Sequence, residues 1–136
     1  MKKQVLLFLV DTDQKKISSL CRVAKKHFDN REHLMIFAAD DKALQYIDDL
    51  LWKYPEDSFL PHIISQKKTE EYIVITKLRE NLNYAKFAFN LCPTPILHGD
   101  FQIIYDFEDK TSPHKCMLSQ KRFEAYKEAK LIIESR

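Results

Sequence analysis

The hydrophobic positions of the chain alternate between short continuous runs and helical stripes. The run QVLLFLV at residues 4–10 predicts a strand that is buried on both faces and lies centrally in a sheet. A stripe with helical spacing follows it, and Asp13 is predicted to cap that helix. The apolar residues of the stripe are Ile17, Leu20, Cys21, Ala24 and Phe28. Most basic residues of this segment lie elsewhere, so one face of the helix is expected to be buried.

The next stretch repeats the order of strand and helix. HLMIFAA at residues 33–39 predicts a second core strand, and Asp40 and Asp41 open a second helix. The inner side of this helix carries Leu44, Ile47 and Leu51. Further strands are expected at residues 72–76, 86–91 and 101–107. The pattern predicts a three-layer α/β/α fold with a mostly parallel, Rossmann-like sheet.

The end of the chain has the pattern of a closing helix over residues 115–134. The side chains expected to face the body of the protein are Leu118, Ala125, Ala129, Ile132 and Ile133. The chain contains no internal repeat, no low-complexity tract and no break in composition. We therefore expect one domain over residues 1–136.

Composition narrows the function classes. Gly99 is the single glycine, so the glycine-rich loops that bind nucleotide phosphates are absent and the fold is expected to lack a phosphate-binding loop. The net charge of +2 is too balanced to hold nucleic acid through the overall field. Three cysteines without a C-x-x-C pair or a secretory leader indicate reduced thiols and a cytoplasmic location. No apolar run is long enough to span a membrane.

Two aspartates leave the first strand in VDTDQ, which raises a catalytic alternative. Phosphohydrolases of the haloacid dehalogenase type use such a D-x-D together with magnesium. In that interpretation Asp11 is the nucleophile and Asp13 the acid. Acidic residues such as those of GDFQIIYD would hold the metal. Gln14 and Lys15 depart from that motif. The favoured interpretation is that Asp11 ends the strand and Asp13 caps the helix. The five histidines have no zinc-ligand spacing, so neither a metal nor a cofactor is predicted.

The segment LLWKYPEDSFLPH at residues 50–62 is apolar but interrupted by two prolines. Trp52 is rotated away from the Leu44, Ile47 and Leu51 stripe, and Phe59 follows between Pro55 and Pro61. Large aromatic side chains on a stiffened loop suit a protein-docking surface, because docking then costs little entropy. The alternative is that the loop folds over the sheet edge and buries both rings.

The closing helix carries a second candidate surface. Phe123, Lys127 and Lys130 lie on a flank away from the predicted stripe, with Tyr126 at its border. Between residues 114 and 130 there are five basic residues against two acidic ones. Aromatic rings beside cations suit an acidic peptide that ends in an apolar residue. The alternative is an ordinary solvated helix face.

Residues 40–62 resemble the matching stretch of the chi subunit of bacterial DNA polymerase III. The shared pattern is an acidic cap, an amphipathic helix and then L-W-x-x-P-x-x-S-F-x-P-H. The resemblance extends to the LLFLVD strand and to RFEAYKEAK near the end, which is similar to R-Y-x-A-Y-R of that family. The segment from about residue 65 to 100 matches poorly.

This resemblance implies a non-catalytic accessory factor of the clamp loader. It places a surface for the psi subunit at Trp52, Phe59 and Pro61. It places binding of the acidic C-terminal tail of single-stranded-DNA-binding protein at Arg122, Phe123 and Tyr126, and Lys121 and Lys127 would add charge. An iron-sulphur helicase engages the psi-facing surface in some bacteria, and no direct contact with nucleic acid or membrane is implied.

Two positions depart from the family pattern. Gln120 and Glu124 stand where family members commonly have basic residues, and each lost cation is expected to weaken the hold on a carboxylate. A small magnesium-dependent phosphohydrolase and a stand-alone nucleic-acid-binding module remain the alternatives to a docking adaptor.

Overall fold

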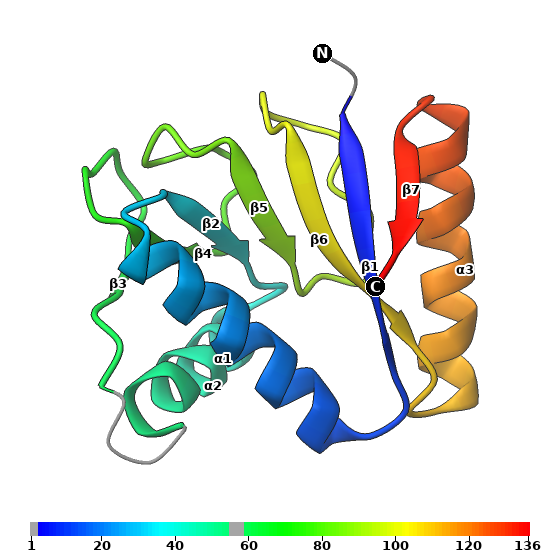
Figure 1. Ribbon diagram of the computed structural model, residues 1–136, viewed down its shortest axis with the longest axis horizontal. Helices are drawn as coiled ribbons and strands as arrows, with labels where there is room; N and C mark the ends of the chain where they lie inside the picture. The colour runs from blue at the N-terminus through cyan, green and yellow to red at the C-terminus, as the bar shows by residue number, and fades with distance from the viewer. Residues whose placement is uncertain (1–2, 55–58) are drawn as a thin grey trace.

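The computed structural model describes residues 3–54 and 59–136. In this part of the chain, seven parallel strands form one sheet in the order β3-β4-β2-β5-β6-β1-β7 (Figure 1). The strands are β1 (Gln4–Val10), β2 (Leu34–Phe37), β3 (Ile63–Ile64), β4 (Ile73–Thr76), β5 (Phe87–Asn90), β6 (Ile103–Asp109) and β7 (Ile132–Ser135). The predicted parallel α/β sheet is confirmed.

Helices cover both faces of the sheet. They are α1 (Asp13–Asp29), α2 (Asp41–Lys53) and α3 (Pro113–Glu128). Successive side chains of β2 point to opposite faces of the sheet, where two separate cores lie. Leu34 and Ile36 pack with residues of α1 and α2. Met35 and Phe37 belong to the core that contains Tyr126 of α3. The three-layer α/β/α prediction is therefore confirmed. Among the described residues, no helix combines the length and apolar character needed to cross a membrane.

Two expectations about the first elements are wrong in detail. The cap of α1 is Thr12, whose Oγ1 accepts a hydrogen bond from the Lys15 amide at 3.1 Å, and Asp13 is already helical. The backbone is still extended at Thr12, so its hydroxyl is the one that reaches the free amides of the first turn. β1 lies between β6 and β7, one strand from the edge of the sheet, because β5 and β6 take the central positions beside β2.

The closing helix is shorter than predicted. α3 ends at Glu128, the chain turns through Lys130 at φ 65°, and residues 132–135 form β7 instead of further helix. β7 pairs in parallel with β1, from Gln4 opposite Ile132 to Leu7 opposite Ser135. The two isoleucines that the helical pattern placed on an inner stripe are therefore strand residues that complete the edge of the sheet. A β-branched pair suits this position.

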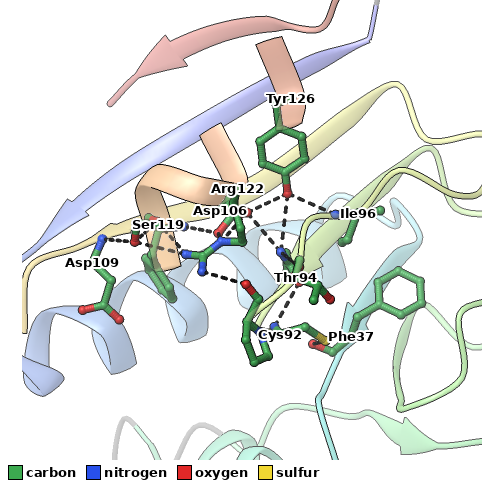
Figure 2. A network of polar contacts seen from close by, with 12 residues as sticks. Phe37, Cys92, Thr94, Ile96, Asp106, Asp109, Ser119, Arg122 and Tyr126 are labelled. Atoms are coloured by element: carbon green, nitrogen blue, oxygen red, sulfur yellow. Dashed lines mark hydrogen bonds and ion pairs between the residues drawn. The ribbon is translucent and has the colours of Figure 1, made fainter. Parts of the chain in front are cut away.

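α3 is held to the sheet by buried polar groups rather than by the predicted apolar stripe (Figure 2). Nε of Arg122 lies 3.2 and 3.3 Å from the two carboxylate oxygens of Asp106 on β6. The Tyr126 hydroxyl donates to the same carboxylate at 2.7 Å, and the Asn90 amide donates to it at 3.0 Å. The side chains of Asp106 and Arg122 are 1% and 8% exposed. The prediction of the inner face of α3 is therefore wrong. The face that packs against the sheet is the one that carries Arg122 and Tyr126, because both side chains bond to Asp106.

Helix α1 is linked to β6 by a second buried polar contact. Nε2 of His27 lies 2.8 Å from the Tyr105 hydroxyl, and the imidazole meets the rings of Phe87 and Tyr105 edge-on. Nδ1 of His27 is 4.0 Å from the carboxylate of Glu32. Burial lowers the pKa of His27, and the attraction of Glu32 offsets only part of that effect. His27 is therefore a neutral core side chain.

Replacing Arg122 by methionine should destabilise the fold strongly. The variant leaves the buried Asp106 carboxylate without its cation, which costs about 3–5 kcal/mol in comparable buried pairs. The free energy of unfolding from urea titration is the measurement. Arg22→Met on the exposed face of α1 is the control, with an expected change of about 0.5 kcal/mol or less. The double variant Arg122→Met with Asp106→Asn should recover part of the loss; a change below about 1 kcal/mol for the single variant would contradict this account.

Acidification should expose the contribution of His27. An unfolded histidine has a pKa near about 6.5, and the folded value is lower, so the unfolded chain takes up the proton first as the pH falls. The free energy of unfolding should then fall below pH ~6.5 with a slope of up to about 1.4 kcal/mol per pH unit from this group. His27→Gln should lack this component. If the free energy of unfolding changes with pH in the same way in both proteins between about pH 7.5 and 5, the effect is excluded.

Candidate functional site

The aromatic side chains of the 50–62 segment lie at the surface. Trp52, in the last turn of α2, is 40% exposed, and Phe59 is 64% exposed. Ile63 at the start of β3 adds an apolar side chain that is 40% exposed, and Pro61 is also exposed. The alternative in which both rings are sealed inside the globule is wrong. Pro55 and Ser58, which belong to the sequence pattern, lie outside the described residues.

Phe59 has an unfavourable backbone conformation. Its φ is 43°, in the left-handed region that costs a residue other than glycine about 1–3 kcal/mol. The next residue, Leu60, is buried at 4% exposure, and its amide donates to the Leu51 carbonyl at the end of α2. Burial of Leu60 therefore offsets the strain and leaves the ring of Phe59 facing outward. Residues in this backbone region often cluster at binding sites, although Arg31, Tyr84 and Lys130 also have a positive φ in this protein.

The side chain of His62 packs against the indole of Trp52. Its side chain is fully buried, and its ring centroid lies 4.4 Å from that of Trp52. Nδ1 of His62 is 2.6 Å from the Leu60 carbonyl oxygen, and Nε2 is 2.8 Å from a carboxylate oxygen of Asp48 on α2. The imidazole thus joins the loop to the helix and fixes the orientation of the indole. No role was predicted for His62 from the sequence. Its only signal there was its place as the last residue of the family pattern that ends in P-H.

The predicted acidic-tail residues of α3 are divided between the interior and the surface. Arg122, Phe123 and Tyr126 are buried, with Tyr126 fully enclosed, whereas Lys121 and Lys127 are exposed. The expectation that Phe123 lies on a free flank with Tyr126 at its border is wrong, because both side chains are buried. Their side of the helix faces β6 and the loop before it, where the Tyr126 hydroxyl also accepts the Ile96 amide (Figure 2).

The electrostatics of this interior cluster follow from its burial. Burial raises the pKa of the Asp106 carboxyl, and the Arg122 guanidinium is the strongest opposing influence. Burial also raises the pKa of Tyr126, and the neighbouring Asp106 carboxylate adds to the rise. Arg122 donates further bonds from Nη2 to Ser119 and to the Phe107 carbonyl. The cluster is internally satisfied and acts as a scaffold. An acidic residue inside the apolar run FQIIYDF was the sequence signal for it.

The two aspartates of the phosphohydrolase alternative are not assembled into a reactive pair. Asp11 is exposed and forms an ion pair with Lys15 at 2.8 Å, and the hydrogen bond and charge of Lys15 lower the pKa of its carboxyl. Asp13 is the first residue of α1. The Asp106 oxygens are taken by the partners described above. Within residues 3–54 and 59–136, no three His, Cys, Asp or Glu side chains are grouped as metal ligands.

Two adjoining cavities lie beyond the carboxyl ends of the central strands. The larger, of about 500 Å³, lies between α1, α2 and α3, and the smaller is about 260 Å³. Both include Ala39, Asn90, Cys92 and Pro93 in their walls. Burial raises the pKa of Cys92, and it raises the pKa of Cys21 to about 11, so neither thiol is poised as a nucleophile. Ligands of open parallel sheets bind at this edge, although sequence reasoning placed no site here.

Comparison with known proteins agrees with the resemblance drawn from the sequence. No curated protein matches the chain. The family model described as DNA polymerase III chi subunit, HolC, matches residues 1–134 of the 136 residues, and so includes the poorly matching middle segment. The chain therefore belongs to the chi subunit family of DNA polymerase III.

Proposed function

We propose that this protein is a non-catalytic docking adaptor of the replicative clamp loader. One surface would bind a psi-type partner, and α3 would bind the acidic C-terminal tail of single-stranded-DNA-binding protein. Family membership supports an accessory role in DNA replication, in the cytoplasm. The single observation that carries the proposal is the exposed pair Trp52 and Phe59, the second of which is held outward at a cost in backbone strain.

The geometry around Trp52 supports a protein partner. We define the Trp52 surface as Trp52, Phe59, Pro61 and Ile63, all of which are exposed. Three of its members are large apolar side chains, and His62 holds the indole in place before any partner arrives. A preorganised aromatic anchor gives affinity because fewer rotamers are lost on binding. An iron-sulphur helicase would compete with the psi-type partner if it used the same surface.

The proposal for the acidic tail depends on exposed charge rather than on the buried cluster. Lys121 and Lys127 are free to meet carboxylates, while Arg122 and Tyr126 hold the helix in position and Phe123 offers only an 8% exposed edge. Four exposed lysines and two glutamates remain between residues 114 and 130. Exposed charge pairs are individually weak, so we expect low affinity for the tail.

Weak attachment on two sides is sufficient for an adaptor. In Figure 1, α2 and α3 lie toward opposite ends of the sheet, and they cover opposite faces. Two partners could therefore bind together without touching each other. Joining two modest contacts raises the local concentration of each partner near the other, so overall retention exceeds either affinity.

The alternatives have less support. A phosphohydrolase would need Asp11 and Asp13 to act as a pair, whereas Asp11 is an exposed residue beside Lys15 and Asp13 is the first residue of α1. A module that binds bare nucleic acid would need a cationic face, whereas the charges of the chain are nearly balanced. Neither candidate explains the Trp52 surface.

Trp52→Ala should release the psi-type partner. Loss of a central tryptophan commonly costs about 2 kcal/mol or more, which is roughly a thirtyfold weaker complex. The measurement is recovery of clamp-loader components with the tagged protein from the native cell. Tyr84→Ala is the matched control, because Tyr84 is 69% exposed on a different loop, between β4 and β5. Equal recovery with both variants would remove the Trp52 surface as the anchor.

Replacing Lys121 and Lys127 together by alanine should weaken binding of an acidic peptide that ends in phenylalanine. Each exposed contact is worth about 0.2–1 kcal/mol, so we expect the loss of two contacts to weaken binding about two- to thirtyfold, and the loss should shrink as salt is added. Fluorescence anisotropy of a labelled peptide gives the affinity. Lys25→Ala with Lys26→Ala on exposed positions of α1 removes the same charge elsewhere. A similar loss in both double variants would mean that net charge, and not the α3 site, determines binding.

A further inference from the structure

The smaller cavity is basic and has no role in the proposed docking function. It lies at the carboxyl ends of β2 and β5, enclosed by the loop after β4 and by residues 92–98. The ionisable side chains in its wall, apart from the thiol of Cys92, are Lys77, Arg79 and His98. No carboxylate belongs to that wall, although Asp41 pairs with Lys77 at 2.9 Å from outside it. The cavity therefore favours an anion.

The hydrogen-bonding groups of the wall are mainly donors. Nη2 of Arg79 donates to Oγ1 of Thr94 at 2.7 Å, which leaves the Thr94 hydroxyl hydrogen able to donate onward. Arg79 has further N–H groups, and the Lys77 ammonium adds others. Pro93 and Pro95 contribute no backbone N–H to this loop. The site is thus built from side chains, which is how a chain with a single glycine can hold an oxyanion without a glycine-rich loop.

His98 is the third basic side chain in the wall of the cavity. Its ring stands edge-on to Phe37 at 5.1 Å, and its Nδ1 is buried without a hydrogen-bond partner among the described residues. A buried polar atom without a partner is unfavourable. Burial and then the positive charges of Arg79 and Lys3 lower the pKa of His98. An anion in the cavity would oppose those positive charges. It could also accept a hydrogen bond from a ring N–H of His98.

The number of donors indicates the type of oxyanion. The side chains of the wall can together donate hydrogen bonds to more than two acceptor atoms; the donors are Lys77, Arg79, Thr94 and His98. A carboxylate presents two oxygens, whereas a phosphate monoester presents three, each a strong acceptor. Arg79 suits phosphate well because its planar guanidinium forms paired bonds to two oxygens.

The larger cavity indicates what the phosphate would carry. It shares Ala39, Asn90, Cys92 and Pro93 with the basic cavity, so the two cavities adjoin and the organic group of a phosphate bound in one would lie beside the other. Two charged pairs of its wall, Arg122 with Asp106 and Lys16 with Asp109, are already satisfied within the protein, and the wall also includes Asp13 and Lys115. Much of the remaining wall is apolar, from residues such as Ile17, Leu20, Ile47, Leu50 and Leu91. Figure 2 shows the boundary region, where the Cys92 thiol donates to the Phe37 carbonyl at 3.5 Å.

We propose that the basic cavity binds the phosphate of a small phosphomonoester whose apolar organic group occupies the adjoining larger cavity. No residue of the Trp52 surface lines either cavity, so ligand and psi-type partner are expected to bind independently. No chemical step is needed, since the site holds the phosphate through hydrogen bonds and charge alone.

Phenyl phosphate, inorganic phosphate and benzoate are the probes for this site. Isothermal titration of the full chain should show phenyl phosphate binding at least tenfold tighter than either other anion, because only it fills both cavities. Arg79→Ala should weaken phenyl phosphate at least tenfold, whereas Arg22→Ala, which removes an exposed arginine from α1, should not. In NMR spectra the pKa of His98 should rise when phenyl phosphate is bound.

Three results would overturn the proposal. They are equal loss of affinity in the two arginine variants, equal affinity for the three anions, and a His98 titration that phenyl phosphate does not move. Arg79 is exposed, so its replacement should not disturb folding. His98→Gln is a second variant in case it does, and it should also weaken phenyl phosphate. Trp52→Ala should leave phosphate binding intact, which separates this test from that of the docking function.

Discussion

The structure depends on one buried carboxylate. Asp106 lies on a central strand, and its two oxygens receive Arg122 and Tyr126 from α3 and Asn90 from the adjacent strand. A charge in this position is tolerable only when each lone pair is occupied, since the cost of desolvation is otherwise large. The requirement fixes the rotation of α3 about its axis, because Arg122 and Tyr126 must both point inward. It also decides which lysines of the helix remain in solvent.

The same contact shapes the carboxyl edge of the sheet. Asn90 bridges Asp106 and the Thr94 carbonyl, so the proline-rich loop after β5 is tied to the interior through one amide. That loop contributes Cys92 and Pro93 to the lining of both cavities. Parallel strands end at one edge, and α1, α2 and α3 leave space there because they cover different parts of the two faces. The cavities are therefore a product of the scaffold that positions α3.

The Trp52 surface and the buried cluster of α3 are stabilised in different ways. At the Trp52 surface, apolar rings are exposed, and burial of Leu60 and the hydrogen bonds of His62 compensate for the strain at Phe59. In α3, the aromatic residues of the family pattern are buried, and the side chains that project outward are mostly charged or polar, together with Met117. Membership of a replication accessory family, together with this division, is consistent with a protein that acts through contacts rather than through bond-making.

Local patterns in the sequence determined most elements, because strand and helix periodicities depend on neighbouring residues. β1, α1, β2 and α2 follow the hydrophobic runs, and the rotation of Trp52 away from the Leu44 stripe could be derived from helical geometry. The single glycine likewise excluded a phosphate loop without any structure. Family-specific residues near Trp52 then indicated the accessory role.

Other features required contacts between distant residues, which only the tertiary structure decided. β7 exists because β1, far earlier in the chain, offers an unpaired edge, so a helical pattern over residues 115–134 could not reveal it. Arg122 is buried because Asp106 lies opposite it on β6, although a charged residue alone is expected at the surface. The basic cavity likewise brings Lys77 and Arg79 from the loop after β4 together with His98 from the loop after β5. Periodicity reports on the faces of single elements, but charge pairing and cavities arise only where several elements meet.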